Sequence, residues 1–122
     1  MSSLKGKIAL VTGSGRGLGK VMAQRLADQG ANIVLHDIDW DAPEKYKEAQ
    51  SLGEVAKEFE KKGVEVLAVT GNIGDVQAVA AMCSKIEEKF SQVDILVNCA
   101  GGDIGASGGK PSPNNALDIP IE

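Results

Sequence analysis

Residues 8–20 read IALVTGSGRGLGK and carry most of the information about the architecture. The apolar run at 8–11 is flanked by polar residues, which is typical of a short buried strand. A glycine-rich turn that leads from a strand into a helix points backbone N–H groups at an incoming anion. We therefore expect a phosphate-binding turn in a parallel α/β fold. Its glycines stand at every second position: Gly13, Gly15, Gly17 and Gly19.

Apolar residues at helical spacing predict three helices. The first stops before Gly30, the second covers 44–62 and stops before Gly63, and the third has Asp75 as its N-cap. The residues expected to face inward are Leu18, Val21, Met22, Leu26 and Ala27 in the first helix, Leu52, Val55 and Phe59 in the second, and Val76, Val79, Cys83, Ile86 and Phe90 in the third.

Further apolar runs at 32–35, 64–69 and 95–97 predict three more strands. The order β-α-β-α-β-α-β implies a Rossmann-like, doubly wound α/β fold with a parallel sheet and right-handed crossovers. Because 95–97 is apolar on both faces, we expect these to be the first four strands of a larger sheet. We interpret 1–101 as the NAD(P)-binding portion and 102–122 as a Gly/Pro-rich, substrate-side loop that starts a missing catalytic half. Whether the chain is truncated, cleaved or naturally short stays open.

Composition narrows the classes of function. The 122 residues suit one domain, and the net charge of −4 argues against nucleic-acid binding. No apolar run approaches the roughly 20 residues of a membrane span, and the N-terminus lacks the apolar core of a secretory signal. We expect a cytoplasmic protein in which Cys83 and Cys99, which form no CxxC pair, are buried thiols.

Three nucleotide-binding patterns compete for the glycine-rich turn. The Walker pattern fails because Val21 follows Lys20, and GxGxxG fails because no third glycine stands at the required position. The pattern TGxxxGxG fits, with Thr12 as its first residue. In it, Gly13 turns the chain off the strand, Gly17 lets backbone approach a pyrophosphate, and Gly19 lets the helix pack closely.

Asp37 ends the second predicted strand, where an acid in a dinucleotide fold accepts hydrogen bonds from the adenosine ribose. Two like charges about 4 Å apart repel by about 4 kcal/mol at an effective dielectric constant of about 20, so Asp37 disfavours the extra phosphate of NADP. Arg16 favours NADP instead, because a guanidinium near that ribose could bind the extra phosphate. Asp39 or Asp41 could take the ribose-binding role in place of Asp37. We predict NAD as the cofactor, with NADP the lesser alternative, and read His36 as a packed or solvent-facing residue without a catalytic role.

Three stretches, in this order, resemble the short-chain dehydrogenases/reductases. The first is the glycine motif that begins at Thr12, and the second is GNIGD at 71–75, which is similar to the family's segment after the third strand. The third is VDILVNCAG at 93–101, which is similar to the family's NNAG segment, with Cys99 in place of the second Asn.

The resemblance implies an NAD-dependent oxidoreductase that passes hydride between the cofactor and an alcohol or ketone substrate. Members of the family usually form dimers or tetramers, so we expect a homo-oligomer, such as a homotetramer. The resemblance also assigns roles along the cofactor. Gly13, Arg16 and Leu18 contact the pyrophosphate and ribose mainly through backbone; Asp37 holds the adenosine ribose; Asn72 and Ile73 recognise adenine; and Asn98, Ala100 and Gly101 line the path to the nicotinamide ribose.

The family's catalytic Tyr-x-x-x-Lys is absent, since the one tyrosine, Tyr46, is followed four residues later by Gln50. We assign no catalytic residue and no metal ligand within 1–122. Two stretches, 41–51 and 101–120, look longer than the family pattern, and the second is either a lid over the substrate or a disordered loop. Two other functions stay open: a non-catalytic dinucleotide-binding module, and a methyltransferase whose S-adenosylmethionine loop is the GxGxG that begins at Gly13.

Overall fold

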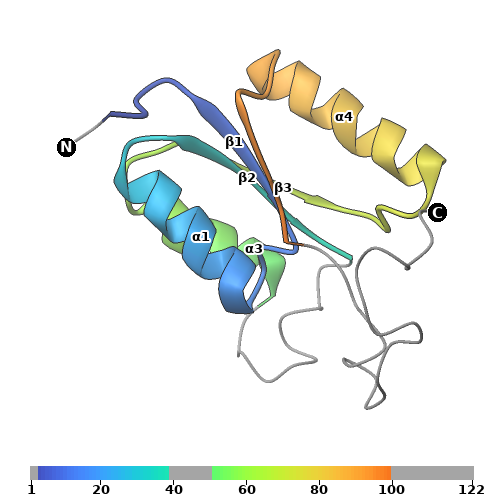
Figure 1. Ribbon diagram of the computed structural model, residues 1–122, viewed down its shortest axis with the longest axis horizontal. Coiled ribbons are helices and arrows are strands. Elements are labelled where there is room, and N and C mark those ends of the chain that lie inside the picture. The colour runs from blue at the N-terminus through green and yellow to red at the C-terminus, as the bar shows by residue number, and fades with distance from the viewer. Residues whose placement is uncertain (1–2, 39–50, 100–122) are drawn as a thin grey trace, which may run out of the picture.

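The computed structural model describes residues 3–38 and 51–99. Four strands form one parallel sheet in the order β3-β2-β1-β4. They are β1 (Ile8–Thr12), β2 (Asn32–Asp37), β3 (Val66–Thr70) and β4 (Ile95–Asn98), and they alternate with α1 (Gly17–Asp28), α3 (Leu52–Glu60) and α4 (Val76–Phe90). Helices α1 and α3 cover one face of the sheet and α4 covers the other (Figure 1). The prediction of a doubly wound α/β fold is confirmed.

The face under α1 and α3 is closed. Strand residues of alternating positions point into it, and Phe59 of α3 is completely buried there. Lys20 of α1 and Glu58 of α3 add an ion pair of 3.4 Å between the two helices. The largest core cluster therefore lies on this face; its strand members include Ala9, Val11, Ile33, Leu35 and Val66.

The face under α4 is only partly closed. Met82 and Ile86 of α4 pack on Val34 and Val69, which belong to β2 and β3. Leu96 of β4 points to the same side but is 56% exposed. Among the described residues β4 is an edge strand, so its outer residues have neighbours on one side only.

Two predicted helix faces are wrong in part. In α1 the buried residues are Gly19, Ala23 and Ala27, whereas Leu18, Val21 and Met22 are exposed, because the helix approaches its support through its smallest side chains. In α4 the buried residues are Met82 and Ile86, with Val79 and Phe90 packed at the margin. Val76 and Cys83 are exposed instead. In α1 the error comes from ranking positions by side-chain size rather than by the closeness of the helix to the sheet.

The element boundaries also differ from the expected ones. The second helix begins at Leu52, because the side chain of Ser51 accepts a hydrogen bond from the Glu54 amide and caps it. The first part of the predicted helix, 44–50, lies outside the described residues. Strand β3 starts two residues later than predicted and β1 extends to the polar residue Thr12, whereas β2 ends at Asp37 as expected. The predicted N-cap at Asp75 is confirmed, since its carboxylate accepts from the Gln77 amide at 2.9 Å.

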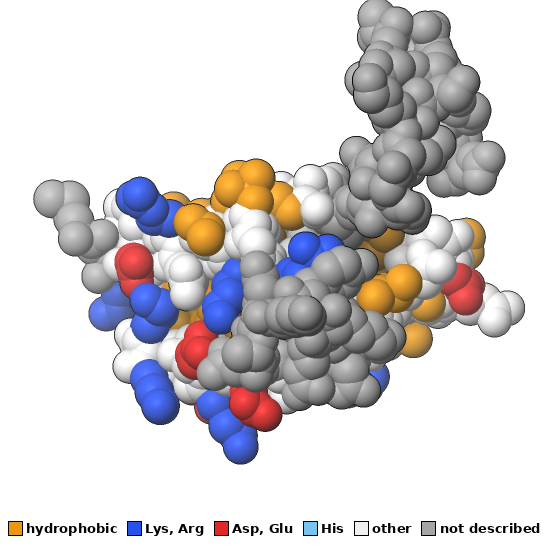
Figure 2. Space-filling view, turned by 90° about the horizontal axis from the view of Figure 1, so that it is seen from below, with side chains coloured by type: hydrophobic (Ala, Val, Ile, Leu, Met, Phe, Trp, Pro, Cys, Tyr) orange, Lys and Arg blue, Asp and Glu red, His pale blue; other side chains and the backbone are white. Residues whose placement is uncertain are grey.

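The described surface carries charges of both signs. Figure 2 shows basic side chains at several separate places on one face, with acidic side chains between them. The expected burial of both thiols is wrong: Cys83 is exposed, and Cys99, which packs at the margin of the main core beside Met22 of α1, is only half-buried. In residues 3–38 and 51–99, no helix has the length and apolar character needed to cross a membrane.

Candidate nucleotide-binding site

The carboxyl ends of all four strands meet at one edge of the sheet. Thr12 of β1 pairs in register with Asn98 of β4, and Asp37 of β2 pairs with Thr70 of β3. The loops that follow these residues therefore lie together. In open parallel sheets, ligands bind in the crevice outside the carboxyl ends of the strands.

Two positions of the turn after β1 require glycine, each for a different structural reason. Gly17 has a φ of 59°, in the left-handed region, and open space around the position where a Cβ would stand. Gly19 has an ordinary φ, but a Cβ there would overlap the carbonyl group of Gly13. The backbone of Gly17 is thus left without a side chain over it, while Gly19 lets α1 press directly on the turn.

The first half of the turn is tied to the end of β2. The amide of Gly13 donates to the Nδ1 atom of His36 at 3.1 Å, and the amide of Ser14 donates to the His36 carbonyl at 2.7 Å. The amide of Gly15 donates to Oδ2 of Asp37 at 3.2 Å. Three successive amides are therefore engaged by two residues of a neighbouring strand, which fixes the shape of this half.

The second half of the turn becomes the N-terminus of α1. Arg16 occupies the N-cap position in an extended conformation, and its side chain makes no capping hydrogen bond. The first amides of any helix lack partners within that helix, and the helix dipole makes this end electropositive. Because α1 begins at Gly17 with no acidic residue in its first turn, this end suits an anion. Leu18, the next residue, is 70% exposed.

Asp37 lies beside the turn and is half-buried. Its Oδ1 accepts from the Ile38 amide at 2.9 Å, while its Oδ2 holds the Gly15 amide. Its own carbonyl accepts from the Gly71 amide at 3.1 Å, which joins it to the loop after β3. The carboxylate is therefore oriented by backbone groups on two sides and reaches the glycine turn.

The loop 71–75 closes on itself between β3 and α4. Oδ1 of Asn72 accepts from the Gly74 amide at 2.8 Å, and the Asn72 carbonyl accepts from the Asp75 amide at 2.9 Å. The side-chain oxygen of Asn72 is thus used within the loop. Asn72 is exposed and Ile73 is 43% exposed, so both border the same edge of the sheet.

The end of β4 is joined to β1 by a side chain. Oγ1 of Thr12 accepts from the Cys99 amide at 3.1 Å, and it donates to the Val97 carbonyl at 3.4 Å. The thiol of Cys99 lies 3.3 Å from the sulfur of Met22 on α1. Asn98 is exposed beside this junction. The remaining predicted contacts, Ala100 and Gly101, lie outside the described residues.

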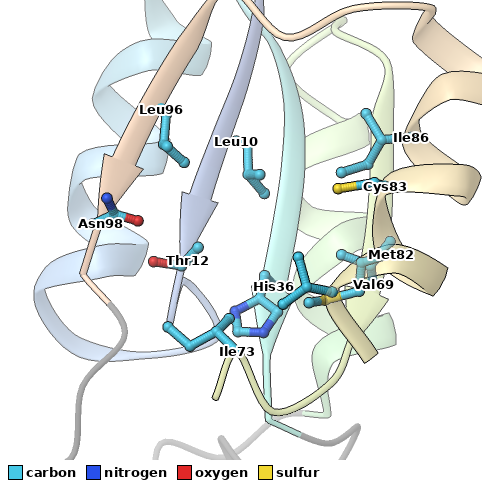
Figure 3. Close-up of a pocket in the computed structure, with 11 residues that line it drawn as sticks. Leu10, Thr12, His36, Val69, Ile73, Met82, Cys83, Ile86, Leu96 and Asn98 are labelled. Atoms are coloured by element: carbon cyan, nitrogen blue, oxygen red, sulfur yellow. The ribbon is translucent and has the colours of Figure 1, made fainter. Parts of the chain in front are cut away.

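A mainly apolar pocket of about 280 Å³ opens beside this edge, between the sheet and α4. Figure 3 shows Leu10 and Leu96 on its strand side and Cys83 and Ile86 on its helix side. His36 and Ile73 lie together at one end of it. The pocket therefore continues from the loop 71–75 along the less covered face of the sheet.

The contacts of Ser14 and His36 in the turn were not predicted from the sequence. Oγ of Ser14 accepts from the His36 amide at 3.0 Å, so Ser14 continues the strand pairing into the turn. His36 is packed, as one of the two predictions for it stated, and is only 3% exposed. Strand alternation could have placed its ring on the face opposite Leu35, but spacing alone does not show which backbone groups it meets.

In the part of the chain that the structure describes, no group of three or more His, Cys, Asp or Glu side chains is placed to hold a metal ion. Tyr46, residues 41–50 of the predicted insertion at 41–51 and the hypothetical lid at 101–120 lie outside the described ranges.

Comparison with known proteins agrees with this geometry. Residues 7–118 match the family model described as short chain dehydrogenase. The chain is 38% identical over 98 residues to (2S)-[(R)-hydroxy(phenyl)methyl]succinyl-CoA dehydrogenase subunit of Thauera aromatica, which covers 80% of this chain and 36% of that protein. The family match at 7–118 includes the glycine turn, the loop 71–75 and the end of β4.

Two solved structures of dehydrogenases or reductases are also similar to the chain. The chain is similar to a NAD+-bound xylitol dehydrogenase, with a TM-score of 0.70, 31% identity and coverage of 83% of this chain and 35% of the other. It is also similar to L-sorbose reductase from Gluconobacter frateurii, complexed with NADPH and L-sorbose, with a TM-score of 0.72, 35% identity and coverage of 84% and 36%. The chain thus spans about a third of the length of each of these relatives.

Proposed function

The chain belongs to the short-chain dehydrogenase family, and from this premise we propose that it forms the NAD-binding part of an oxidoreductase acting on an alcohol or ketone. The observation that carries the proposal is the position of Asp37, whose carboxylate lies 3.2 Å from the Gly15 amide of the glycine turn. An acid at that point is placed for a ribose hydroxyl, next to a helix N-terminus placed for a diphosphate.

The residues present fit a nicotinamide dinucleotide. Gly17 places no side chain over the backbone where α1 begins, and Gly19 brings that helix against the turn. A nicotinamide cofactor, once bound, supplies the hydride chemistry, while the protein supplies binding and orientation. The family membership also favours this ligand over S-adenosylmethionine, although the GxGxG that begins at Gly13 would suit either.

We assign the parts of the cofactor by their order along the sheet edge. The amides around Arg16, Gly17 and Leu18 hold the diphosphate, and Asp37 accepts hydrogen bonds from the adenosine ribose. Ile73 receives adenine on its exposed side chain and backbone. Asn72 contributes its amide nitrogen, since its oxygen already serves the Gly74 amide. Gly13 and Gly19 shape the turn, and Asn98, Ala100 and Gly101 lead toward the nicotinamide ribose.

The choice of NAD over NADP rests on charge. A phosphate on the adenosine ribose would bring a second anion to Asp37, at a place where both carboxylate oxygens already accept from backbone amides. Solved relatives include one with bound NAD+ and one with NADPH, so the family alone does not choose. The residue at the end of β2 is what favours NAD here.

Calorimetry with NAD, NADP and S-adenosylmethionine tests the proposal on the same protein. We expect NAD to bind most tightly. Asp37→Ala should reduce the preference for NAD over NADP by about tenfold or more. The substitution removes the repulsion between the carboxylate and the ribose phosphate of NADP, which is a few kcal/mol for two like charges about 4 Å apart. The same titrations at high salt should show a smaller preference in the original protein.

Asp28→Ala is the matched control for this measurement. It removes the same charge from an exposed ion pair with Lys62 at the far end of α1. It should leave the ratio of the NAD and NADP affinities unchanged. If Asp37→Ala and the original protein have equal ratios of NAD to NADP affinity, Asp37 does not bind the adenosine ribose.

Other parts of the expected function stay predictions. A homo-oligomer, a dimer or a tetramer, and a cytoplasmic location are expected from the family and the sequence. The substrate class, a small alcohol or carbonyl compound, is inferred from the relatives: one is a dehydrogenase of a hydroxylated succinyl-CoA and another is complexed with a sugar.

A further inference from the structure

The ring of His36 is buried and makes a hydrogen bond at each nitrogen. Nδ1 lies 3.1 Å from the Gly13 amide nitrogen, and Nε2 lies 2.8 Å from the Gly71 carbonyl oxygen. Only 3% of the residue is exposed. The ring therefore spans from the turn after β1 to the loop after β3, across the end of β2.

The two partners determine which nitrogen carries the proton. A backbone amide can only donate, so Nδ1 must accept from Gly13 and carry no hydrogen. A backbone carbonyl can only accept, so Nε2 must donate to Gly71. His36 is thus a neutral imidazole in a single tautomer, held between two backbone groups whose roles cannot be exchanged.

The bond to Gly13 also bears on the position of α1. The carbonyl of Gly13 is the group that a Cβ at Gly19 would overlap, so this turn and the first turn of α1 are in direct contact. A shift of the Gly13 backbone would move the surface against which α1 rests. The other bond holds Gly71, which immediately precedes Asn72 and Ile73.

We propose that His36 is a positioning residue that sets the spacing between the diphosphate-binding turn and the adenine-binding loop. The assignment rests on the proposed function. His36 touches neither ligand group itself but fixes the backbone on both sides of Asp37. Removing its Nδ1 acceptor leaves the Gly13 amide without its partner and lets the turn relax away from the geometry that the diphosphate needs.

Substitution of His36 by asparagine or glutamine tests its two hydrogen bonds one at a time. The Oδ1 atom of asparagine is attached to Cγ, as Nδ1 is in histidine, so His36→Asn keeps an acceptor for Gly13 and loses the donor for Gly71. The amide nitrogen of glutamine is one bond further out, as Nε2 is, so His36→Gln keeps a donor for Gly71 and loses the acceptor for Gly13. His36→Phe keeps the bulk of the ring and loses both bonds.

The experiment is calorimetric titration of NAD into the full chain and its variants, with thermal midpoints measured alongside. We expect His36→Phe and His36→Gln to weaken NAD binding by about tenfold or more, as the loss of a hydrogen bond to a buried donor allows. His36→Asn should stay within about threefold of the original protein. Val34→Ala, a buried change on the same face of β2, should lower the midpoint and leave the affinity unchanged.

A second measurement reads the tautomer directly. Long-range ¹H–¹⁵N spectra of the ring should show the hydrogen on Nε2 and a bare Nδ1 at neutral pH. A hydrogen on Nδ1, or equal affinities for His36→Gln and His36→Asn in a protein that binds NAD, would overturn the assignment of His36 alone. Failure of the original protein to bind NAD would overturn the proposed function, and this assignment with it.

Discussion

On one face of the sheet, α1 and α3 leave Val11, Ile33 and Leu35 with no exposed surface, whereas on the other face α4 leaves Leu96 of β4 56% exposed. Part of the difference is that β4 is an edge strand among the described residues, and part is that two helices cover the first face and one covers the second. Helix α1 reaches its side through Gly19, Ala23 and Ala27, so it lies close. The polar edge of the sheet thus has one firmly packed side and one open side.

The arrangement shows how a fixed site can border a pocket. The glycine turn and α1 rest on the closed face, which resists displacement because well-packed cores deform little. The pocket opens on the face of α4, where Leu10 and Leu96 have room beside them. Groups that must stay in place and groups that must admit a ligand are therefore supported by opposite faces of one sheet.

The largest effect should come from the closed face. Phe59→Ala removes a fully buried ring from the main core and should lower the free energy of unfolding by about 3–5 kcal/mol. Guanidinium unfolding followed by circular dichroism measures it. Phe90→Ala is the matched control, because Phe90 is only partly buried beside the second cluster and should cost much less. Equal losses would contradict the contrast between the faces.

An intermediate effect is expected under α4. Met82 is 7% exposed and borders the pocket, so its side chain has fewer packing partners than Phe59. Met82→Ala should lower the free energy of unfolding by about 2 kcal/mol, at the low end for a buried methionine. The same unfolding experiment applies, and a loss as large as that of Phe59→Ala would mean that the two faces are equally packed.

The smallest effect should come from the open side of β4. Leu96→Ala in this chain of 122 residues should change the free energy of unfolding by no more than about 0.5 kcal/mol, as exposed substitutions usually do. Thermal or chemical unfolding at two protein concentrations measures it. A loss above about 1.5 kcal/mol would show that an apolar layer covers Leu96, and a dependence on concentration would identify that layer as a second copy.

The sequence predicted the order of the elements and the place of the site, because both follow from local patterns. The apolar run before Thr12, the glycines after it and the acid at Asp37 lie within one β-α-β unit. It predicted only part of the buried side of α1: Gly19 and Ala27 are buried as expected, whereas Ala23 was missed and Leu18, Val21 and Met22 are exposed, because closeness and not hydrophobicity selects the buried positions. Nor did it reveal the bonds of His36, because these join three strand ends that are distant in the sequence.

The contact between Gly19 and the Gly13 carbonyl has a consequence for engineering. Replacing a glycine inside a helix by alanine is a common way to strengthen the helix, because alanine has the higher helix propensity. Gly19 cannot be replaced in this way, since the new methyl group would clash with the backbone of Gly13, which cannot move as a flexible side chain could. Gly53 in α3 differs, because its nearest outside neighbour would be the Ser51 hydroxyl oxygen at 3.9 Å. Attempts to make this domain more heat-resistant can therefore start at the second helix and should leave the first untouched.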